Sequence, residues 1–492
     1  MERGSGILLH ISALPSKYGI GSFSKEAKQF VKTLKFAGQK YWQILPLNPT
    51  GFKDSPYQSN SCFALNPYFI DLDQLKKKHY LSEEEISEFS KSKNTGSVDF
   101  EFLYNNRYKL LEIAAKKALK VEKNKIDKFY NSQKFWLKDY ACFMTLKKTT
   151  NNKPWNEFDI DLRKHKRDVI DKYIEKNLET FNIFVAIQYF AFQQYFKLKK
   201  YANSRGIYII GDLPIYVSYD SCDVWGHQKE FLLNKDYKPS LVAGVPPDYF
   251  SEDGQLWGNP LYNYEKMEKN NFRWWSKRIK HASKLYDLIR IDHFRGFASY
   301  YTIPIDSVSA KNGTWKIGPR EKIINVFKKY ADGRIIAEDL GILTDDVYEL
   351  MDYAKYPGIN VLQFGLDGNM NHKYLPHMYS ENAVAYLSTH DNDVMMHFLA
   401  TNSDKKRLLC EYLNISQLSD GQIVDEAIKA LMNSKANIVI FTPQDILHLD
   451  ESTRFNVPGT DEGNWKFRFQ KRQLKKELFY KLYDISCRSD RY

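Results

Sequence analysis

The sequence predicts an α/β protein built on a closed (β/α)8 barrel, as one domain over residues 1–492. Eight short apolar runs recur along the chain, and helical patterns separate most of them. Nearly continuous apolar strands that alternate with helices are typical of a parallel sheet covered on both faces. Eight such strands fit a closed barrel better than an open sheet. Acidic residues end four of the predicted strands, and the C-terminal ends of barrel strands all meet at one rim.

The first two predicted strands flank one helix. They are the apolar runs at residues 6–12 and 41–47. Between them Ser24 is a suitable N-cap, apolar residues then recur at helical spacing, and Gly38 ends the pattern. A strand, a helix and a second strand in this order form the basic unit of a parallel sheet.

A long helical insertion is predicted between the second and third strands, at residues 72–203. Lysine and glutamate are frequent in it, and apolar residues follow the helical period at residues 82–91, 104–119 and 181–203. We identify no convincing strand there. The segment is therefore interpreted as an insertion into the barrel, and its sequence indicates no function.

The remaining six strands follow the insertion. We place them at residues 206–214, 288–294, 334–341, 359–364, 383–391 and 437–442. Helical patterns lie between most of them, for example at residues 345–353, and a last helix is expected at residues 466–485. The chain thus carries the eight strands that a closed barrel needs.

The net charge of the chain and its distribution indicate which kinds of partner it can bind. The net charge is +12, which is compatible with a protein that binds nucleic acid or an acidic membrane surface. The lysines are, however, spread among many acidic residues, and no arginine-rich block accompanies them. A solvated surface explains this pattern better, so we expect neither nucleic acid nor a membrane as partner. The sequence predicts no oligomeric state.

Cysteine usage and the N-terminus indicate a reducing compartment. The five cysteines are odd in number, widely spaced and without a CxxC or Cys/His ligand pattern, which argues against a disulfide framework or a zinc site. The apolar run near the N-terminus is short and is interrupted by His10, unlike a secretory signal. No apolar stretch approaches the length of a membrane span. We therefore expect a cytoplasmic protein.

The four acidic strand ends form the candidate active site. Asp212, Asp292, Glu338 and Asp391 end the third, fourth, fifth and seventh predicted strands. Any one of them alone is as readily explained as a capping or ion-paired residue. Four carboxylates gathered at one rim repel each other, however, so their convergence indicates a functional reason.

Two of these acids match a retaining glycoside-processing enzyme, which needs one nucleophilic and one protonated carboxyl group. Arg290 lies on the same strand face as Asp292, and we expect its guanidinium to depress the pKa of that nucleophile. Apolar neighbours and nearby carboxylates are expected to raise the pKa of Glu338, which suits a general acid. Asp391, preceded by His390, is placed to hold sugar hydroxyls.

A Gly- and Pro-rich segment at residues 242–262 lies between the third and fourth strands, at the same rim. It contains three aromatic residues, Tyr249, Phe250 and Trp257. Long loops at this position often cover a substrate, so we interpret the segment as an active-site lid. A structural loop whose aromatic residues pack on the barrel is the alternative. Residues 54–57 and 456–465 form two further rim loops, and the first reads equally well as a polar turn or a substrate contact.

Several stretches match one known family in combination. The most specific are residues 242–260, the run RIDHFRG at residues 290–296 and the run THDND at residues 389–393. Further matching stretches lie at residues 4–15, 42–57, 211–216, 337–341 and 456–465. Together they resemble the amylomaltases, the 4-alpha-glucanotransferases also known in plants as disproportionating enzyme. The helical insertion matches poorly, so the resemblance implies nothing about it.

The resemblance implies roles for the site residues. Asp292 would be the nucleophile, Glu338 the general acid and base, and Asp391 the residue that stabilises the transition state. Arg290 and His390 match residues that contact the nucleophile or the sugar at the cleavage point. The residues that match the family's glucan-binding groove are Tyr57, Asp212, Trp257 and Asn259.

The resemblance also implies a barrel with inserted subdomains, no separate C-terminal β-domain, and neither cofactor nor metal. One departure is Ser388, where many members have glycine. We do not expect this residue to affect the chemistry.

The expected activity is transfer of an α-1,4-glucan segment to the 4-hydroxyl of a glucose or maltooligosaccharide acceptor by retaining double displacement. An amylase-like hydrolase with the same acids, and water as acceptor, is the nearest alternative. A non-catalytic glucan-binding protein is a second alternative and a basic nucleic-acid binder a third. The complete set of acids argues against the second, and only the 242–262 segment and the resemblance favour transfer over hydrolysis.

Overall fold

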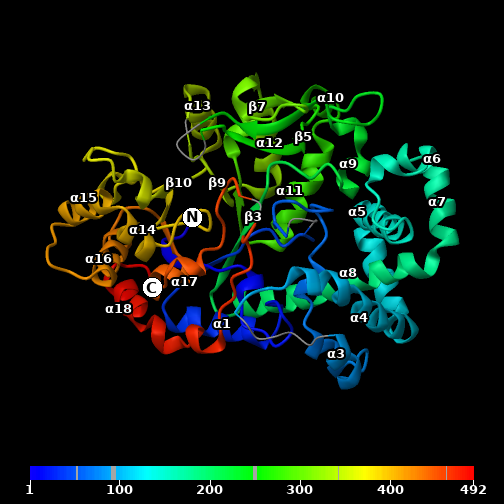
Figure 1. The fold of residues 1–492 in the computed structure, drawn as a ribbon, viewed down its shortest axis with the longest axis horizontal. Helices are drawn as coiled ribbons and strands as arrows, with labels where there is room; N and C mark the ends of the chain where they lie inside the picture. Colours follow the sequence, from blue (N-terminus) through cyan, green and yellow to red (C-terminus); the bar gives the residue numbers. More distant parts are fainter. Residues whose placement is uncertain (51–53, 90–95, 248–251, 342, 461) are drawn as a thin grey trace.

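Eight parallel strands form the centre of the molecule (Figure 1). The computed structural model describes all of the chain except residues 51–53, 90–95, 248–251, 342 and 461. The strands are β1 (Gly4–Leu8), β2 (Tyr41–Gln43), β3 (Tyr208–Leu213), β6 (Leu288–Ile291), β9 (Ile335–Ala337), β10 (Gly358–Val361), β11 (Ala383–Tyr386) and β12 (Ile438–Phe441). Their order in the sheet is β10-β11-β12-β1-β2-β3-β6-β9.

The two outer strands of this order also meet. Ala337 N, at the end of β9, donates a 2.9 Å hydrogen bond to Pro357 O, which directly precedes β10. Each of the eight predicted apolar runs overlaps one of the strands. The predicted (β/α)8 barrel is therefore confirmed.

Burial follows the alternation of side chains along the strands. Ile210 of β3 faces the barrel interior, whereas its neighbour Ile209 packs against the surrounding helices. The buried interior residues are Leu8, Tyr41, Ile210, Ile336, Ile359, Val361, Val384, Tyr386, Ile438 and Ile440. Because the side-chain period is two, Asp212 and Glu338 continue this inward-facing series at the C-terminal rim.

The first helix forms where the sequence predicts it. In α1 (Lys25–Phe36) the Ser24 side chain caps the helix by accepting from Glu26 N, and Phe30 and Leu34 are buried. Gly38 then adopts φ +70°, a left-handed conformation that favours glycine and turns the chain into β2.

Helices occupy the predicted insertion. They are α2 (Leu72–Lys77), α3 (Glu83–Phe89), α4 (Phe100–Val121), α5 (Lys123–Thr149), α6 (Ile160–Arg163), α7 (Arg167–Lys176) and α8 (Leu178–Asn203). Figure 1 shows α4 to α7 to one side of the barrel. Helix α8 contacts the barrel, because the Tyr195 hydroxyl donates to Leu285 O (2.7 Å). Gln188 of α8 binds both backbone groups of Leu65 at 2.9 Å, and so holds the segment that follows Tyr57.

The predicted rim loop at residues 242–262 is largely β-structure. Strands β4 (Leu241–Val245) and β5 (Gln255–Pro260) pair antiparallel, and β7 (Ser299–Pro304) and β8 (Thr314–Ile317) complete a second sheet of order β5-β4-β7-β8. Gly244 makes the pairing possible, since a Cβ there would lie 2.2 Å from Gln255 O. The glycine and proline residues of this segment indicated a loop, so the two strands were not predicted from the sequence. Tyr249 and Phe250 lie outside the described residues.

The predicted helix at residues 466–485 is wrong up to residue 479. Phe469 N donates to Ala13 O (2.9 Å) and Arg468 N to Gly96 O (2.8 Å), so this stretch is extended and bonds to other parts of the chain. Two 3₁₀ turns (Lys471–Leu474 and Lys476–Phe479) then lead to helix α18 (Tyr480–Arg488). No C-terminal β-domain follows the eighth strand in the described part of the chain.

The other helices of the described residues lie around the strands (Figure 1). They are α9 (Cys222–Gly226), α10 (Tyr264–Lys269), α11 (Arg273–Leu285), α12 (Glu321–Ala331), α13 (Asp345–Ala354), α14 (Met395–Thr401), α15 (Ser403–Leu413), α16 (Asp420–Met432) and α17 (Pro443–Ile446). Among the described residues, no helix combines the length and apolar character needed to cross a membrane.

Candidate active site

The barrel carries the four candidate acids to one rim. Asp212 lies in β3, Asp292 directly follows β6, and Glu338 directly follows β9. These three strands are neighbours in the sheet, and Asp212 is in register with Arg290 of β6. Asp391 lies beyond the end of β11, in the segment that leads to α14.

Arg290 joins two of the acids. Its Nη1 donates to Asp212 Oδ2 at 2.6 Å and to Asp292 Oδ1 at 3.0 Å. The Asp212 side chain is fully buried, whereas 28% of the Asp292 side chain is exposed. Asp212 is therefore held inside the barrel, while Asp292 reaches the surface of the rim.

Burial decides the pKa values of this pair. Burial raises the pKa of Asp292, Asp391 adds to the rise, and Arg290 opposes it. The expectation that Arg290 gives Asp292 a depressed pKa is therefore wrong in its net direction. Burial likewise raises the pKa of Asp212 to about 7, although Arg290 lowers it.

Glu338 has the raised pKa that a general acid needs near neutral pH. Burial is the main cause and raises the pKa to about 7; Arg290 opposes the rise and Asp292 adds to it. Its carboxyl group is fixed from both sides, because Oε2 accepts from His293 N (2.7 Å) and Oε1 from Leu340 N (2.8 Å). His293 reaches this position with φ +50°, a left-handed conformation.

Tyr57 and His390 extend the network across the rim. The Tyr57 hydroxyl donates to Asp212 Oδ2 (3.0 Å) and lies 2.8 Å from His390 Nε2. Because its single proton goes to Asp212, the hydroxyl accepts from His390 Nε2–H. That nitrogen also lies 3.2 Å from Asp391 Oδ2, and burial lowers the pKa of His390. Contacts thus link Tyr57, Asp212, Arg290, Asp292, His390 and Asp391.

Trp257 and Asn259 come from β5 and differ in their contacts. The Trp257 and His293 rings are perpendicular, with ring centroids 4.9 Å apart and an interplanar angle of 89°. It therefore lies beside the residue that follows Asp292. The Asn259 side chain donates to Val217 O at 2.9 Å, which fixes β5 to the segment after β3.

The structure gives partners to residues of the 456–465 rim loop and adds Arg454, which precedes it. Asn456 Nδ2 donates to Asp391 Oδ1 at 2.6 Å, and Arg454 Nη2 donates to Asp391 O at 3.1 Å. Trp465 packs near Tyr57, at 5.8 Å between ring centroids. The 456–465 loop showed its turns and its aromatic end in the sequence, but no pattern indicated these long-range partners.

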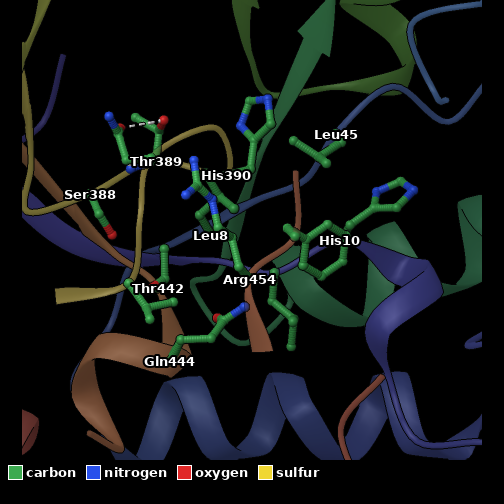
Figure 2. Close-up of a pocket in the computed structure, with 13 residues that line it drawn as sticks. Leu8, His10, Leu45, Ser388, Thr389, His390, Thr442, Gln444 and Arg454 are labelled. Atoms are coloured by element: carbon green, nitrogen blue, oxygen red, sulfur yellow. Dashed lines mark hydrogen bonds between the residues drawn. The ribbon is translucent and has the colours of Figure 1, made fainter. Parts of the chain in front are cut away.

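A small cavity lies beside His390, at the ends of β1, β11 and β12 (Figure 2). Its volume of about 20 Å³ corresponds to about one water molecule, so it does not admit a sugar ring. The lining residues are Leu8, Leu9, His10, Leu45, Ser388, Thr389, His390, Asn392, Val394, Thr442, Gln444, Arg454 and Phe455.

Retaining enzymes that process glycosidic bonds use two carboxyl groups at one site, and on a (β/α)8 barrel the site lies at this rim. Asp292 and Glu338 follow neighbouring strands there, and Glu338 has the raised pKa of a general acid. Residues 9–474 match the family model of glycoside hydrolase family 77, described as 4-alpha-glucanotransferase, and the chain belongs to this family.

Relatives support this assignment along the whole chain. A 4-alpha-glucanotransferase of Clostridium butyricum is 42% identical over 482 residues, which cover 97% of this chain and 99% of the relative. One of Aquifex aeolicus is 40% identical over 486 residues, which cover 97% and 98%. The solved structure of amylomaltase from Streptococcus agalactiae in complex with acarbose is similar with a TM-score of 0.95, at 38% identity and over 100% of both chains. The resemblance found in the sequence is therefore confirmed.

Proposed function

We propose that the chain transfers α-1,4-glucan segments to the 4-hydroxyl of glucose or a maltooligosaccharide by retaining double displacement. Membership of the 4-alpha-glucanotransferase family supports the activity. The observation that carries the mechanism is the pairing of two carboxyl groups at one rim. Arg290 binds the nucleophile Asp292, and burial raises the pKa of Glu338, with a further rise from Asp292.

In the first half of the reaction, Asp292 attacks the anomeric carbon. Arg290 occupies only one of its oxygens, Oδ1, so Oδ2 is the attacking atom. The bond between the anomeric carbon and the glycosidic oxygen breaks, and Glu338 gives its proton to the leaving 4-oxygen. A pKa of about 7 keeps a large fraction of Glu338 protonated at neutral pH.

In the second half, Glu338 is ionised and acts as a base. It takes the proton of the acceptor's 4-hydroxyl, whose oxygen attacks the anomeric carbon and releases Asp292. Two inversions keep the α configuration. The backbone N–H groups of His293 and Leu340 hold the carboxylate in this state.

Asp391 stabilises the positive charge that develops on the sugar ring. The Asp391 side chain is 40% exposed, so it can meet sugar hydroxyls. Asn456 holds its Oδ1, and His390 Nε2 lies 3.2 Å from its Oδ2. Tyr57 and Asp212 support His390 from the barrel interior.

The β4–β5 hairpin favours a sugar acceptor over water. The Trp257 ring lies perpendicular to the ring of His293, the residue that follows the nucleophile, and we propose that it stacks on the acceptor sugar and keeps water out. We propose that the β4–β5 hairpin serves as the active-site lid expected at residues 242–262. Asn259 supports this hairpin, because its amide anchors β5 to Val217 O.

Incubation of the purified protein with maltotriose alone tests the proposed activity. The oligosaccharides are resolved over time, and total reducing ends are measured in parallel. Transfer produces a ladder of longer maltooligosaccharides with free glucose and little gain in reducing ends. Glucose and maltose with a matching rise in reducing ends would instead establish hydrolysis.

We also propose that the enzyme works in the cytoplasm. All five cysteines are free thiols, and Cys142 and Cys222 are buried, as is typical of proteins from reducing compartments. Fractionation of the source cells, with detection of the protein by antibody, tests this location.

A further inference from the structure

A buried carboxyl group outside the reaction contacts the segment that carries His390 and Asp391. Asp445 lies in α17, directly after β12, and is fully buried. It accepts a hydrogen bond from the Ser388 hydroxyl and a second one, of 2.8 Å, from Met395 N. A buried acid is costly unless such donors satisfy it.

The two donors flank the same short segment. Ser388 lies just after β11, and Met395 is the first residue of α14. The residues between them, 389–394, include His390 and Asp391. One carboxyl group therefore holds both ends of the segment that presents these two side chains to the substrate.

The segment is also braced internally. Thr389 donates to Asn392 Oδ1 from its backbone N (2.9 Å) and from its hydroxyl (2.7 Å), and this closes a tight turn. Figure 2 shows this bond, together with Ser388 and with Thr442 and Gln444 from the end of β12. These bonds tie the turn together, so the positions of its two ends set the direction of His390 and Asp391.

The contacts made by the segment depend on its position. His390 Nε2 lies 2.8 Å from the Tyr57 hydroxyl, and Asp391 Oδ1 lies 2.6 Å from Asn456 Nδ2. A displacement of about 1 Å would break both contacts, and misplacement of this size costs on the order of 100-fold in rate.

We propose that Asp445 is a positioning residue that acts through Ser388 and Met395 to place His390 and Asp391 for catalysis. Ser388 then takes part indirectly in the chemistry, contrary to the expectation from sequence. This inference rests on the proposed function, because its effect is measured as transfer activity.

Variants of Asp445 and Ser388 test the proposal by steady-state kinetics on maltotriose and by thermal melting. Asp445→Ala removes both acceptors and should lower kcat by about 10- to 100-fold with little change in KM. Ser388→Ala keeps the Met395 contact and should lower kcat by about 3- to 10-fold. Asp445→Asn should restore kcat to within about threefold of wild type, since its oxygen accepts from Met395 N and its amide donates to the Ser388 hydroxyl.

Asp287→Ala is the matched control. Asp287 accepts from Ile209 N and Asn203 Nδ2, both at 2.8 Å, and lies before β6, at the opposite end of the barrel. Its replacement should lower the melting temperature and leave the kcat of the folded protein unchanged. This variant separates lost stability from lost positioning.

Wild-type kcat in folded Asp445→Ala, or an equal loss of kcat in Asp287→Ala, would overturn the proposal. Should Asp445→Ala not fold, wild-type kcat in Ser388→Ala would overturn it, and a lowered kcat with unchanged KM would support it. An inactive wild-type enzyme would instead contradict the proposed function, so the two failures are distinguishable.

Discussion

Tyr57 and His390 lie with their rings stacked, at an interplanar angle of 10°, and the Tyr57 hydroxyl is 2.8 Å from His390 Nε2. The same hydroxyl donates to Asp212, which in turn binds Arg290. One phenol therefore connects the acidic side of the rim, after β3 and β6, with the side after β11. The orientation of His390 depends on this connection.

Tyr57→Phe keeps the ring and removes both hydrogen bonds. We expect kcat to fall by about 5- to 30-fold, because two bonds to partly charged partners are lost while packing is retained. Steady-state kinetics on maltotriose measure the change.

Tyr195→Phe is the control for this substitution. It also removes one hydrogen bond of a tyrosine hydroxyl (2.7 Å), but the acceptor there is Leu285 O, at the end of α11. Its kcat should equal that of wild type. A full wild-type rate in Tyr57→Phe would show that the hydroxyl does not matter for catalysis.

The rate should fall as pH rises through about 7. Glu338 must be protonated to assist the leaving group, and burial places its pKa at about 7. A pH–rate profile of kcat/KM on maltotriose should therefore show an alkaline limb near that pH. For α-maltosyl fluoride, whose leaving group needs no proton, formation of the maltosyl–enzyme should lack this limb. An alkaline limb in that step as well would assign it to another group.

Asp212→Asn should change how stability depends on pH. A carboxyl group whose folded pKa of about 7 exceeds its unfolded value of about 4 binds its proton more tightly when folded. Its contribution to stability is complete below about pH 4 and is lost as pH rises to about 7. The variant lacks this loss. The difference between its free energy of unfolding and that of wild type should therefore shift in favour of the variant by about 2 to 4 kcal/mol from pH 4 to pH 8.

Urea unfolding at several pH values measures this difference. Asp236→Asn, at an exposed position, is the control and should follow the wild-type curve. A constant difference between Asp212→Asn and wild type across the range would contradict the raised pKa of Asp212.

Asn456 is expected to hold Asp391 for the transition state. Asn456→Ala removes the 2.6 Å bond to Asp391 Oδ1 and should lower kcat by about 10-fold. Asn456→Asp places a second carboxylate against Asp391 and should be more harmful. Kinetics of both variants on maltotriose test this order, and equal rates for both would count against it.

The fold was largely predictable because its signals are local. Apolar runs and capping residues such as Ser24 mark the strands and helix α1, and the strand period places Arg290 and Asp292 side by side. The features that the sequence did not predict depend on contacts between residues far apart in the chain. The β4–β5 hairpin relies on the close backbone approach at Gly244, and the extended stretch at residues 466–469 donates hydrogen bonds to the carbonyl groups of residues 13 and 96.

The candidate site, too, has parts that the sequence predicts and parts that depend on contacts between distant residues. The acids at strand ends follow from the barrel, since their place along each strand fixes the rim. The Asn456 contact to Asp391 and the Asp445 contact to Ser388 join loops far apart in the chain, and no spacing in the sequence encodes them. The pKa of Asp292 depends on how deeply the barrel buries it, which a neighbouring arginine in the sequence does not reveal.

Trapping of the covalent intermediate tests the role of Asp292 most directly. Glu338→Gln is incubated with α-maltosyl fluoride, which reacts without a general acid, while loss of the base slows release of the sugar. Mass spectrometry of the intact protein and its peptides should show one maltosyl unit, attached to Asp292. An adduct on another residue, or rapid turnover without any adduct, would contradict double displacement through Asp292.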